Sequence, residues 1–238
     1  MKKVEITIPI LNEEKTLSNN IREIYSYCEQ NLSQNYQWTI IIADNGSKDK
    51  SPLIGCKLAE DLSNIIYIRE KLSGVGRALK SSWKNSNADI IGYMDLDLSV
   101  PLENISRALE PLINQSFDIV YGSRLHRDSI VKGRSMKREV ISRFFNLIVQ
   151  KYMGTTFSDG MCGFKFLNRK YLSKLMEMGA VSDGWFFCTE ILIVGEFIGL
   201  NLLELPVAWN DNSESQVKIF PLSIEYLKAL RKLKIESK

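Results

Sequence analysis

The amino-acid sequence predicts an α/β domain with a mainly parallel central sheet and helices on both of its faces. Short, β-rich apolar segments alternate with segments of helical periodicity, and the connections between them are short. The expected strands are almost continuously apolar, as strands covered on both faces are. No repeat, low-complexity tract or Gly/Ser linker divides the 238 residues. We therefore expect one main domain over residues 1–219, followed by a basic, amphipathic helical tail over residues 220–238.

Each expected element follows from its own pattern. Residues 4–10 form a short apolar strand, after which Leu17, Ile21, Ile24 and Cys28 recur on one face of a helix. In chain order, the next elements are a strand at 38–43, a helix at 51–62, a strand at 65–68, a helix at 76–86, a strand at 90–94, a helix at 102–114 and a strand at 118–121. The apolar segment 185–209 is expected to be a buried helix followed by a strand. Because parallel strands end at the same edge of a sheet, the polar residues that follow them should gather there.

Composition and charge narrow the class of protein. Hydrophobic residues make up 45% and charged residues 25% of the chain, the balance of an ordinary globular enzyme. The formal charge of +3 is too small to indicate nucleic-acid binding. The apolar start ends at Asn12, too early for a signal peptide, and the segment 185–209 carries three glutamates and Pro206, so a membrane span is not expected. Four scattered cysteines form no CxxC pair, which favours reduced cytoplasmic thiols over disulfides or a zinc site.

The strongest motif is Asp-Leu-Asp-Leu-Ser at residues 95–99, directly after the expected strand 90–94. Two carboxylates at one strand end can approach the same hard cation. Mg²⁺ or Mn²⁺ held by one or two carboxylates completes its coordination shell with phosphate oxygens and water. Such a metal would neutralise the charge that develops on a departing nucleoside diphosphate. The alternative interpretation of Asp95 and Asp97 is a pair of solvated loop aspartates, and their place at the end of a central strand favours the metal.

Two further segments are candidates for binding a nucleotide. Asp44 follows the apolar strand 38–43, where it could accept hydrogen bonds from a base or ribose, or could form an Asx-turn or a helix cap. The glycines around Gly76 could let the backbone approach a phosphate or a sugar, and we include Gly76 among the nucleotide-binding candidates. As a dinucleotide fingerprint this pattern is poor, because the third glycine is missing and the unit follows the third strand, which argues against a dehydrogenase.

A basic segment covers residues 122–153. It combines lysines and arginines with an apolar helical stripe made of Val140, Ile141, Phe144, Phe145, Ile148 and Tyr152. This combination suits an anionic lipid headgroup with an apolar tail nearby, or a membrane surface. A helix packed on the sheet with a solvated basic edge is an equal alternative. His126 is a weak candidate for a general base, and Glu190, on the expected buried helix, is either functional or a structural hydrogen-bond acceptor.

A set of motifs occurs in the order and at the spacing expected of glycosyltransferase family 2: IPILNEE, ADNGSKD, GVGRALK, DLDLS, YGSR, KREVISRFFN, SDGMCGFKF, GWFFCTEIL and ELPVAW. From residue 4 to residue 219 the chain resembles the polyprenyl-phosphate branch of that family, enzymes similar to dolichol-phosphate mannose and glucose synthases. The resemblance implies the GT-A fold, a nucleotide-sugar donor, a metal at the Asp-x-Asp motif and transfer with inversion. It also implies a polyprenyl phosphate acceptor and a peripheral position at the cytoplasmic face of a membrane. It leaves room for a membrane-embedded partner subunit.

The same resemblance assigns roles to individual positions. The residues that match the nucleotide pocket are Pro9, Leu11, Asn12, Glu13, Asp44 and Asp95. Asp95 and Asp97 match the metal and diphosphate site. The residues that match the positions holding the acceptor and donor phosphates are Arg124, Arg138 and Ser142. The candidates for the sugar side are Asp159, Lys165 and Glu190.

Two departures from the family pattern bear on the donor. Cys188 stands where the family commonly has an Asp two residues before Glu190. Where the mannose synthases carry an Arg and a Gly–Glu–Ser–Lys segment, this chain has WNDNSESQVK at residues 209–218. The missing Arg removes a contact to the donor phosphate. Together with the segment around Trp185, it favours a UDP-sugar over GDP-mannose.

The resulting hypothesis is a single in-line displacement catalysed by Asp97, Arg124 and Arg138. An acceptor phosphate oxygen attacks the anomeric carbon of a hexose, and a metal on the two aspartates stabilises the departing nucleotide. A first alternative has a saccharide hydroxyl as acceptor, in the assembly of a cell-surface polysaccharide, with Asp159 or Glu190 as the general base. A second alternative is a non-catalytic subunit that binds a nucleotide sugar, and the intact motif with its arginines argues against it.

Overall fold

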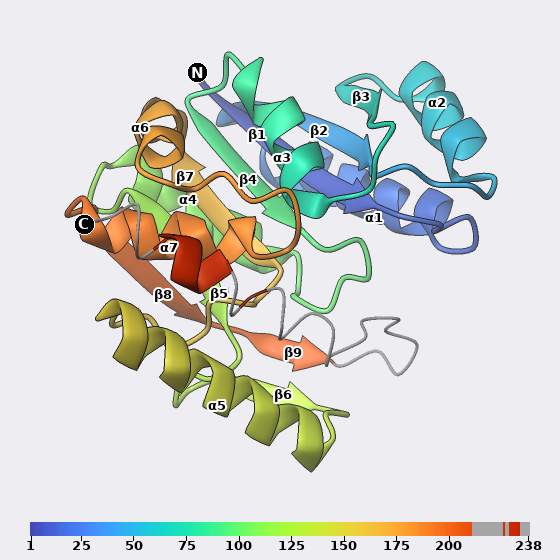
Figure 1. Ribbon diagram of the computed structural model, residues 1–238. Coiled ribbons are helices and arrows are strands. Elements are labelled where there is room, and N and C mark those ends of the chain that lie inside the picture. The colour runs from blue at the N-terminus through green and yellow to red at the C-terminus, as the bar shows by residue number, and fades with distance from the viewer. Residues whose placement is uncertain (211–225, 227–228, 234–238) are drawn as a thin grey trace.

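The structure is a computed structural model that describes residues 1–210, 226 and 229–233 of the chain. The strands of its central sheet are β1 (Lys2–Ile10), β2 (Tyr36–Asp44), β3 (Ile65–Arg69), β4 (Ile90–Met94), β5 (Ile119–Ser123), β7 (Phe164–Asn168) and β8 (Leu202–Pro206). They lie in the order β3-β2-β1-β4-β7-β5-β8 (Figure 1). Two short strands, β6 (Ile130–Lys132) and β9 (Ala208–Asn210), pair in parallel as a separate sheet.

Helices cover both faces of the central sheet, as the alternation of elements predicts. They are α1 (Leu17–Asn31), α2 (Ser51–Asp61), α3 (Val75–Lys84), α4 (Glu103–Ile113), α5 (Met136–Met153), α6 (Leu172–Glu177) and α7 (Phe187–Phe197), with a 3₁₀ turn, η1 (Arg169–Tyr171), before α6. The apolar faces of α1, α2 and α4 belong to one core cluster, and those of α3, α5, α6 and α7 belong to a second. The elements expected up to β5 are all present, and the bounds that the patterns predict differ from the observed ones by at most two residues.

The direction of the strands decides which loops meet. β1 pairs in parallel with β2 and β4, β2 with β3, and β5 with β8. β7 runs antiparallel to both of its neighbours, β4 and β5, so the sheet is mainly but not wholly parallel. As a result, the C-terminal ends of β1, β2, β4 and β5 lie at one edge of the sheet, and the N-terminal end of β7 lies at that edge too. This edge, at the right of the sheet in Figure 1, is where a doubly wound sheet binds its ligands.

The core has two halves because alternate residues of each strand point to opposite faces. Ile6 and Ile8 on β1 pack into the first cluster, whereas Ile91 and Tyr93 on β4 pack into the second. Every residue of β4, β5 and β7 is buried, which agrees with the apolar sequence of β4 and places Lys165 of β7 inside the core. Each fully buried Ile or Leu contributes roughly 1.5–3 kcal/mol through removal of apolar surface from water. The two clusters therefore hold the strand ends in place from both sides.

The apolar stripe expected on α5 is divided in the structure. Phe145 and Val149 are buried, and the Phe145 ring lies 5.2 Å from that of Tyr226 in the tail. On the opposite side, an outward face of exposed apolar residues is made of Met136, Val140, Phe144 and Leu147. The expectation that Phe144 and Phe145 face the same way is therefore wrong, because adjacent residues on a helix lie about 100° apart.

The C-terminal tail is described in part. Tyr226 and residues 229–233 are helical, with Tyr226, Leu230 and Leu233 buried and Arg231 exposed, as an amphipathic helix predicts. The expected boundary between domain and tail at residue 219 lies outside the described residues, as does most of the segment 209–218. In the part of the chain that the structure covers, no helix is long and apolar enough to cross a membrane.

Candidate active site

The loops that follow β1 and β2 are tied to each other at the C-terminal edge of the sheet. The Asn12 amide donates to Ser47 Oγ at 2.9 Å, and Asn12 Oδ1 accepts the Lys48 amide at 2.8 Å. The Glu13 amide donates to Ser51 Oγ at 2.8 Å. Asn12 has a φ of 57°, a left-handed conformation that Asn adopts more readily than most residues. The same corner holds the other residues predicted to line the nucleotide pocket, Pro9 and Leu11.

Asp44 ends β2 and is fully buried behind this corner. Its Oδ1 accepts the Ser47 amide at 2.7 Å, and its Oδ2 accepts the Tyr67 hydroxyl at 2.6 Å. The Arg69 guanidinium lies 3.8 Å from the same Oδ2. The structure therefore favours a local structural role, although Asp44 accepts the amide three residues on and not two residues on as in an Asx-turn. A contact from Asp44 to a base or ribose stays a prediction, and it would have to use the remaining lone pairs.

The Asp-Leu-Asp segment begins where β4 meets the N-terminal end of β7. The Asp95 amide donates to the Gly163 carbonyl at 3.0 Å, and the Asp95 carboxylate lies against the Cα of Gly163, where a side chain would collide with it. Asp97 is exposed, and Leu98 has a φ of 55°, which is rare for a residue with a side chain of this size. Non-Gly residues in this region are strained and cluster at functional sites. This unusual backbone conformation directly follows the two aspartates.

Several charged groups surround this segment. Burial and the neighbouring Asp97 raise the pKa of Asp95 to about 7, while Lys165 and Arg124 act in the opposite direction. Burial, followed by Asp97, also raises the pKa of Glu13. The structure thus brings together residues that the sequence places far apart, with Asp95, Asp97 and Glu13 as a negatively charged group beside two buried cations. The mutual repulsion of Asp95 and Asp97 favours a bound cation or a proton beside them.

Lys165 supplies one of the two buried cations. It is fully buried on β7, opposite Tyr93 of β4, and its ammonium donates to the Cys162 carbonyl at 2.7 Å and to the Tyr93 hydroxyl at 3.4 Å. Burial lowers the pKa of Lys165. No carboxylate is paired with it by a hydrogen bond among the described residues. Lys165 therefore lies under the Asp-Leu-Asp segment as a buried positive charge, not at an exposed sugar-binding position.

Arg124 is the second cation, and it is held in a buried ion pair with Asp159. Its Nε and Nη2 donate to the two oxygens of the Asp159 carboxylate at 2.7 and 2.9 Å, and its amide donates to the same carboxylate at 3.1 Å. The Trp209 ring centroid lies 4.9 Å from the guanidinium carbon, within the range of a cation–π contact. Burial alone would raise the pKa of Asp159, but Arg124 lowers it to about 2. Arg124 is thereby fixed in orientation at the end of β5.

Helix α5 turns a polar stripe toward the site. Ser142 is buried, and its hydroxyl has no hydrogen-bond partner among the described residues. Arg138 lies one turn before Ser142 on the same side of the helix. Asn146, one turn after Ser142, accepts the Gly160 amide on its Oδ1 at 2.8 Å. Since Gly160 follows Asp159, Asn146 joins α5 to the segment that holds Arg124, and the convergence of Arg124 and Arg138 on one phosphate stays a prediction.

Two predicted site residues make contacts within the chain instead. The Gly76 amide donates to the Gly184 carbonyl at 3.2 Å, and a side chain at Gly76 would collide with the Ser182 carbonyl oxygen. Gly76 therefore serves the packing of α3 on the loop before α7, and its amide is not available to a phosphate. Glu190 accepts the Ser182 amide at 2.8 Å and the Ser182 hydroxyl at 2.5 Å. The structural interpretation of Glu190 thus accounts for both of its oxygens.

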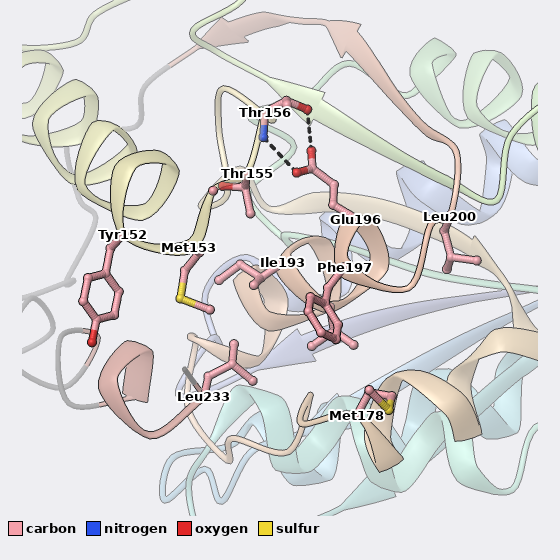
Figure 2. Close-up of a pocket in the computed structure, with 12 residues that line it drawn as sticks. Tyr152, Met153, Thr155, Thr156, Met178, Ile193, Glu196, Phe197, Leu200 and Leu233 are labelled. Carbon is pink, nitrogen blue, oxygen red and sulfur yellow. Dashed lines mark hydrogen bonds between the residues drawn. The ribbon is translucent and has the colours of Figure 1, made fainter. Parts of the chain in front are cut away.

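Neither His126 nor the cavity of Figure 2 is connected with this group of residues. The His126 Nδ1 accepts the Asp128 amide at 3.2 Å on the surface loop after β5. The cavity, of about 470 Å³, lies between the C-terminal end of α5 and helix α7, with Ile193 and Phe197 on its wall (Figure 2). None of the residues predicted for donor, metal or acceptor lines it. The candidate site is therefore the sheet edge and not this cavity.

The chemistry of the two aspartates fits a hard divalent cation. Asp95 and Asp97 offer carboxylate oxygens, which Mg²⁺ and Mn²⁺ prefer. Within the described part of the chain there is no cluster of three or more His, Cys, Asp or Glu residues that could hold a metal by itself. A cation at this segment would therefore depend on oxygens from a bound diphosphate, as Mg²⁺ sites built on one or two carboxylates commonly do.

Comparison with known proteins decides the family. The sequence model described as glycosyl transferase family 2 matches residues 5–176, well over half of the 238 residues. The chain belongs to glycosyltransferase family 2. As a member of this family it is a glycosyltransferase. The match spans the site residues from Pro9 to Lys165, including the Asp-Leu-Asp segment, Arg124, Arg138 and Asp159.

Two relatives illustrate how far the likeness extends. The glycosyltransferase AglD of Haloferax volcanii is 28% identical over 217 residues, which are 91% of this chain and 34% of the relative. The dolichyl-phosphate beta-glucosyltransferase ALG5A of Trichomonas vaginalis is 25% identical over 91% of this chain and 68% of its own length. The family 2 chain thus spans about a third of the first relative and about two thirds of the second.

Solved structures confirm the fold. Glucosyl-3-phosphoglycerate synthase from Mycobacterium tuberculosis, in complex with Mn²⁺, UDP and glucosyl-3-phosphoglycerate, superposes with a TM-score of 0.68 at 15% sequence identity. The alignment covers 98% of this chain and 80% of that protein. The GT-A fold implied by the family 2 resemblance is therefore the fold of this chain.

Three residues of this family 2 site were given no role from the sequence, although Asn146 and Trp209 end two of the motifs that carry the family resemblance. Tyr93 lies in the apolar strand IIGYM, and its hydroxyl is the polar group that meets Lys165. Trp209 is a buried strand residue that stacks on Arg124. Asn146 is the one Asn within the apolar run of α5. A buried Asn or Tyr needs a hydrogen-bond partner, so a polar residue on the inward face of a helix or strand was the available clue.

Proposed function

We propose that this chain transfers a hexose from a nucleotide-diphosphate sugar, with a UDP-sugar favoured, to a polyprenyl phosphate, with inversion at the anomeric carbon. The donor would occupy the corner between the loops after β1 and β2, with Mg²⁺ or Mn²⁺ on Asp95 and Asp97. Bound there, the cation would neutralise charge on the departing nucleoside diphosphate. The relative named as a dolichyl-phosphate beta-glucosyltransferase supports this acceptor class. The solved structure with Mn²⁺ and UDP shows that the fold accommodates this pair of ligands.

The observation that carries the proposal is that the two candidate general bases, Asp159 and Glu190, are both engaged by hydrogen bonds within the chain. Transfer to a saccharide hydroxyl requires a group that removes its proton. Asp159 is locked onto Arg124, which lowers its pKa to about 2, so it is a poor base. Glu190 is occupied by the Ser182 amide and hydroxyl. An acceptor phosphate is already ionised and needs no base, which favours it over the saccharide alternative.

The acceptor side has the donors that a phosphate requires. Ser142 presents a buried hydroxyl that has no partner among the described residues, and a buried polar group left unpaired costs about 1–3 kcal/mol. A ligand oxygen at this position would remove that cost. Arg138, on the same stripe of α5, can add a bidentate contact, because its planar guanidinium matches the spacing of two phosphate oxygens. Arg124, at the end of β5, would contribute a further positive charge to the phosphate site.

The outward face of α5 suits a membrane surface, where a polyprenyl phosphate resides. Of its exposed apolar residues, Met136, Val140 and Phe144 are 80%, 61% and 63% exposed. Exposed lysines at positions 137 and 151 flank them, and such a pattern binds anionic lipid headgroups. We propose a peripheral position at the cytoplasmic face of a membrane, with the inward stripe of α5 toward the phosphate and the outward face toward the lipid. A membrane-embedded partner subunit would fit the same surface.

The test is a screen of radiolabelled UDP-sugars and GDP-mannose with the purified chain, Mg²⁺ or Mn²⁺, and a short polyprenyl phosphate or a free oligosaccharide as acceptor. We expect transfer to the lipid phosphate. Arg138→Ala should reduce it by tenfold or more while UDP binding is retained, because a hydrogen bond to a charged group contributes about 1.5–3 kcal/mol. Arg143→Ala is the matched control, since Arg143 lies on the same helix, is 60% exposed and pairs with Glu139.

Two results would contradict the proposal. If the enzyme glycosylates the free oligosaccharide and ignores the lipid phosphate, the saccharide-acceptor alternative replaces it. If Arg138→Ala and Arg143→Ala both turn over normally, Arg138 does not bind the acceptor phosphate.

A further inference from the structure

We propose that Asn146 is a positioning residue for the acceptor: it locks helix α5 onto the segment that holds Arg124, and so sets the distance between the phosphate-binding groups of the helix and those of the sheet edge. The inference rests on the proposed function, because it assigns Arg138, Ser142 and Arg124 to one acceptor phosphate. It adds a residue that touches neither substrate.

Asn146 is engaged at both ends of its amide. It is 2% exposed, its Oδ1 accepts the Gly160 amide at 2.8 Å, and its Nδ2 donates to the Ser142 carbonyl at 2.9 Å. The first contact joins α5 to a segment far along the chain, and the second fixes the rotamer of the side chain against its own helix. A buried Asn that uses both groups in this way is set in one orientation.

Gly160 is held from two sides. Its amide is taken by Asn146, while its carbonyl accepts the Thr189 hydroxyl of α7 at 3.0 Å. A side chain at this position would lie 2.9 Å from both the Phe157 ring and the Thr189 methyl group. The two helices therefore close on the backbone of one residue, and only glycine allows this approach. Any movement of α5 relative to α7 is transmitted to this peptide.

The Gly160 peptide is connected on both sides to residues of the proposed site. Asp159 precedes Gly160 and holds Arg124 through three hydrogen bonds. In the other direction, the segment reaches Gly163, whose carbonyl accepts the Asp95 amide at 3.0 Å. One short segment thus connects the acceptor helix to Arg124 and to the Asp-Leu-Asp segment.

The spacing of residues along α5 links Asn146 to the two phosphate-binding candidates of the helix. Arg138, Ser142 and Asn146 follow one another at intervals of four residues, so they lie along one stripe of the helix. A contact at Asn146 therefore controls the rotation and the axial position of the two residues that would bind the phosphate. Phosphate ligands on two separate elements act together only if these elements are held in register.

The experiment compares Asn146→Ala with Gln150→Ala in the full chain. Gln150 lies one turn further on, and its Nε2 donates to the Phe157 carbonyl at 2.8 Å, so each variant removes one side-chain hydrogen bond from α5 to the same segment. With polyprenyl phosphate as acceptor, we expect Asn146→Ala to raise the acceptor KM or lower kcat so that kcat/KM falls tenfold or more. UDP binding measured by calorimetry with Mn²⁺ should change less than twofold. Gln150→Ala should leave both quantities within twofold of the wild type.

The same data distinguish a positioning role of Asn146 from a purely structural one. If Asn146→Ala has normal acceptor kinetics, or if donor binding and acceptor kinetics fall together, the positioning role is refuted. If Asn146→Ala does not fold, Asn146→Ser, which is too short to reach Gly160, takes its place. If the wild type uses only a saccharide hydroxyl, the proposed function fails, and the assignment of Arg138, Ser142 and Arg124 to an acceptor phosphate fails with it. If the wild type uses the lipid phosphate and Asn146→Ala behaves like Gln150→Ala, the inference alone fails.

Hydrogen–deuterium exchange gives a reading that needs no acceptor. In Asn146→Ala, the amides of residues 158–163 should exchange faster, because the Gly160 amide has lost its acceptor. The amides of α7 should exchange at the wild-type rate. Unchanged exchange over residues 158–163 would show that Asn146 does not hold this segment and would overturn the proposal.

Discussion

The replacement of Asp159 by Asn tests the buried ion pair on which the site depends. Asp159 is fully buried, and the side chain of Arg124 is 11% exposed. The substitution keeps the shape of the side chain and removes its charge. Arg124 would then lose the carboxylate to which it is hydrogen-bonded, since Trp209 offers only the face of its ring and Asp95 interacts with it through charge, without a hydrogen bond among the described residues.

The size of the effect follows from two estimates. A carboxyl whose pKa falls from its ordinary 3.8 to about 2 stabilises the folded state by about 2 kcal/mol at neutral pH. Removing one partner of a buried pair costs more, about 3–5 kcal/mol, because the other charge stays desolvated. We expect Asp159→Asn to lower the free energy of unfolding by this larger amount. That is a large part of the roughly 5–15 kcal/mol that stabilises a typical domain.

The assay is urea unfolding followed by circular dichroism, with linear extrapolation to water. Asp183→Asn is the control, because Asp183 pairs with Lys80 at 2.7 Å but is 52% exposed, and exposed pairs contribute at most about 1 kcal/mol. The pKa of Asp159 is lower in the folded state, so its stabilisation is present above pH 4 and is lost as the pH falls toward about 2. Asp159→Asn should lack this acid-dependent part. Equal costs for the two variants at pH 7 would refute the reasoning.

Three further outcomes are expected. Excess EDTA should abolish transfer, and undiminished turnover in EDTA would exclude the metal. Asp97→Asn should also abolish transfer but leave the unfolding midpoint unchanged, because Asp97 is exposed. Calorimetric titration in the presence of Mn²⁺ should show tighter binding of UDP than of GDP, and a preference for GDP would favour the mannose branch of the family. Phe144→Asp should weaken sedimentation of the protein with vesicles that contain anionic phosphatidylglycerol. Leu53→Asp, at a 74% exposed position on α2, should not weaken it. Equal binding of the two variants would show that the outward face of α5 does not contact the membrane.

The sequence predicted the order of the elements and most of the positions at which chemistry can occur. Period-two and helical patterns are local properties, so the strands and helices up to β5 could be placed within two residues of their observed bounds. Because parallel strands end at one edge, Asn12, Asp44 and Asp95 could be assigned to a common site before any contact was known. The ordered motifs of the family added the roles of the arginines.

The partners of these residues could not be predicted in the same way. The turn at Asp44 is completed by Tyr67, and the buried charge of Lys165 is accommodated by Tyr93 and the Cys162 carbonyl. Strand β7 was not predicted, because Lys165 interrupts a short apolar segment and a buried strand is not expected to contain a lysine. The contacts with Tyr67 and Tyr93 join residues separated by more than twenty positions, and no local pattern encodes them.

Helix α5 shows most clearly what the sequence determined by itself and what the tertiary structure decided. The sequence predicted a basic helix within residues 122–153 with one apolar stripe that includes both Phe144 and Phe145. It could not decide which side is buried, because Phe144 and Phe145 are equally apolar. The packing of Phe145 against Tyr226, and of Asn146 against Gly160, turns one side to the core and leaves Phe144 exposed. Periodicity gives a helix its faces, but only the surfaces it meets in the folded chain choose among them.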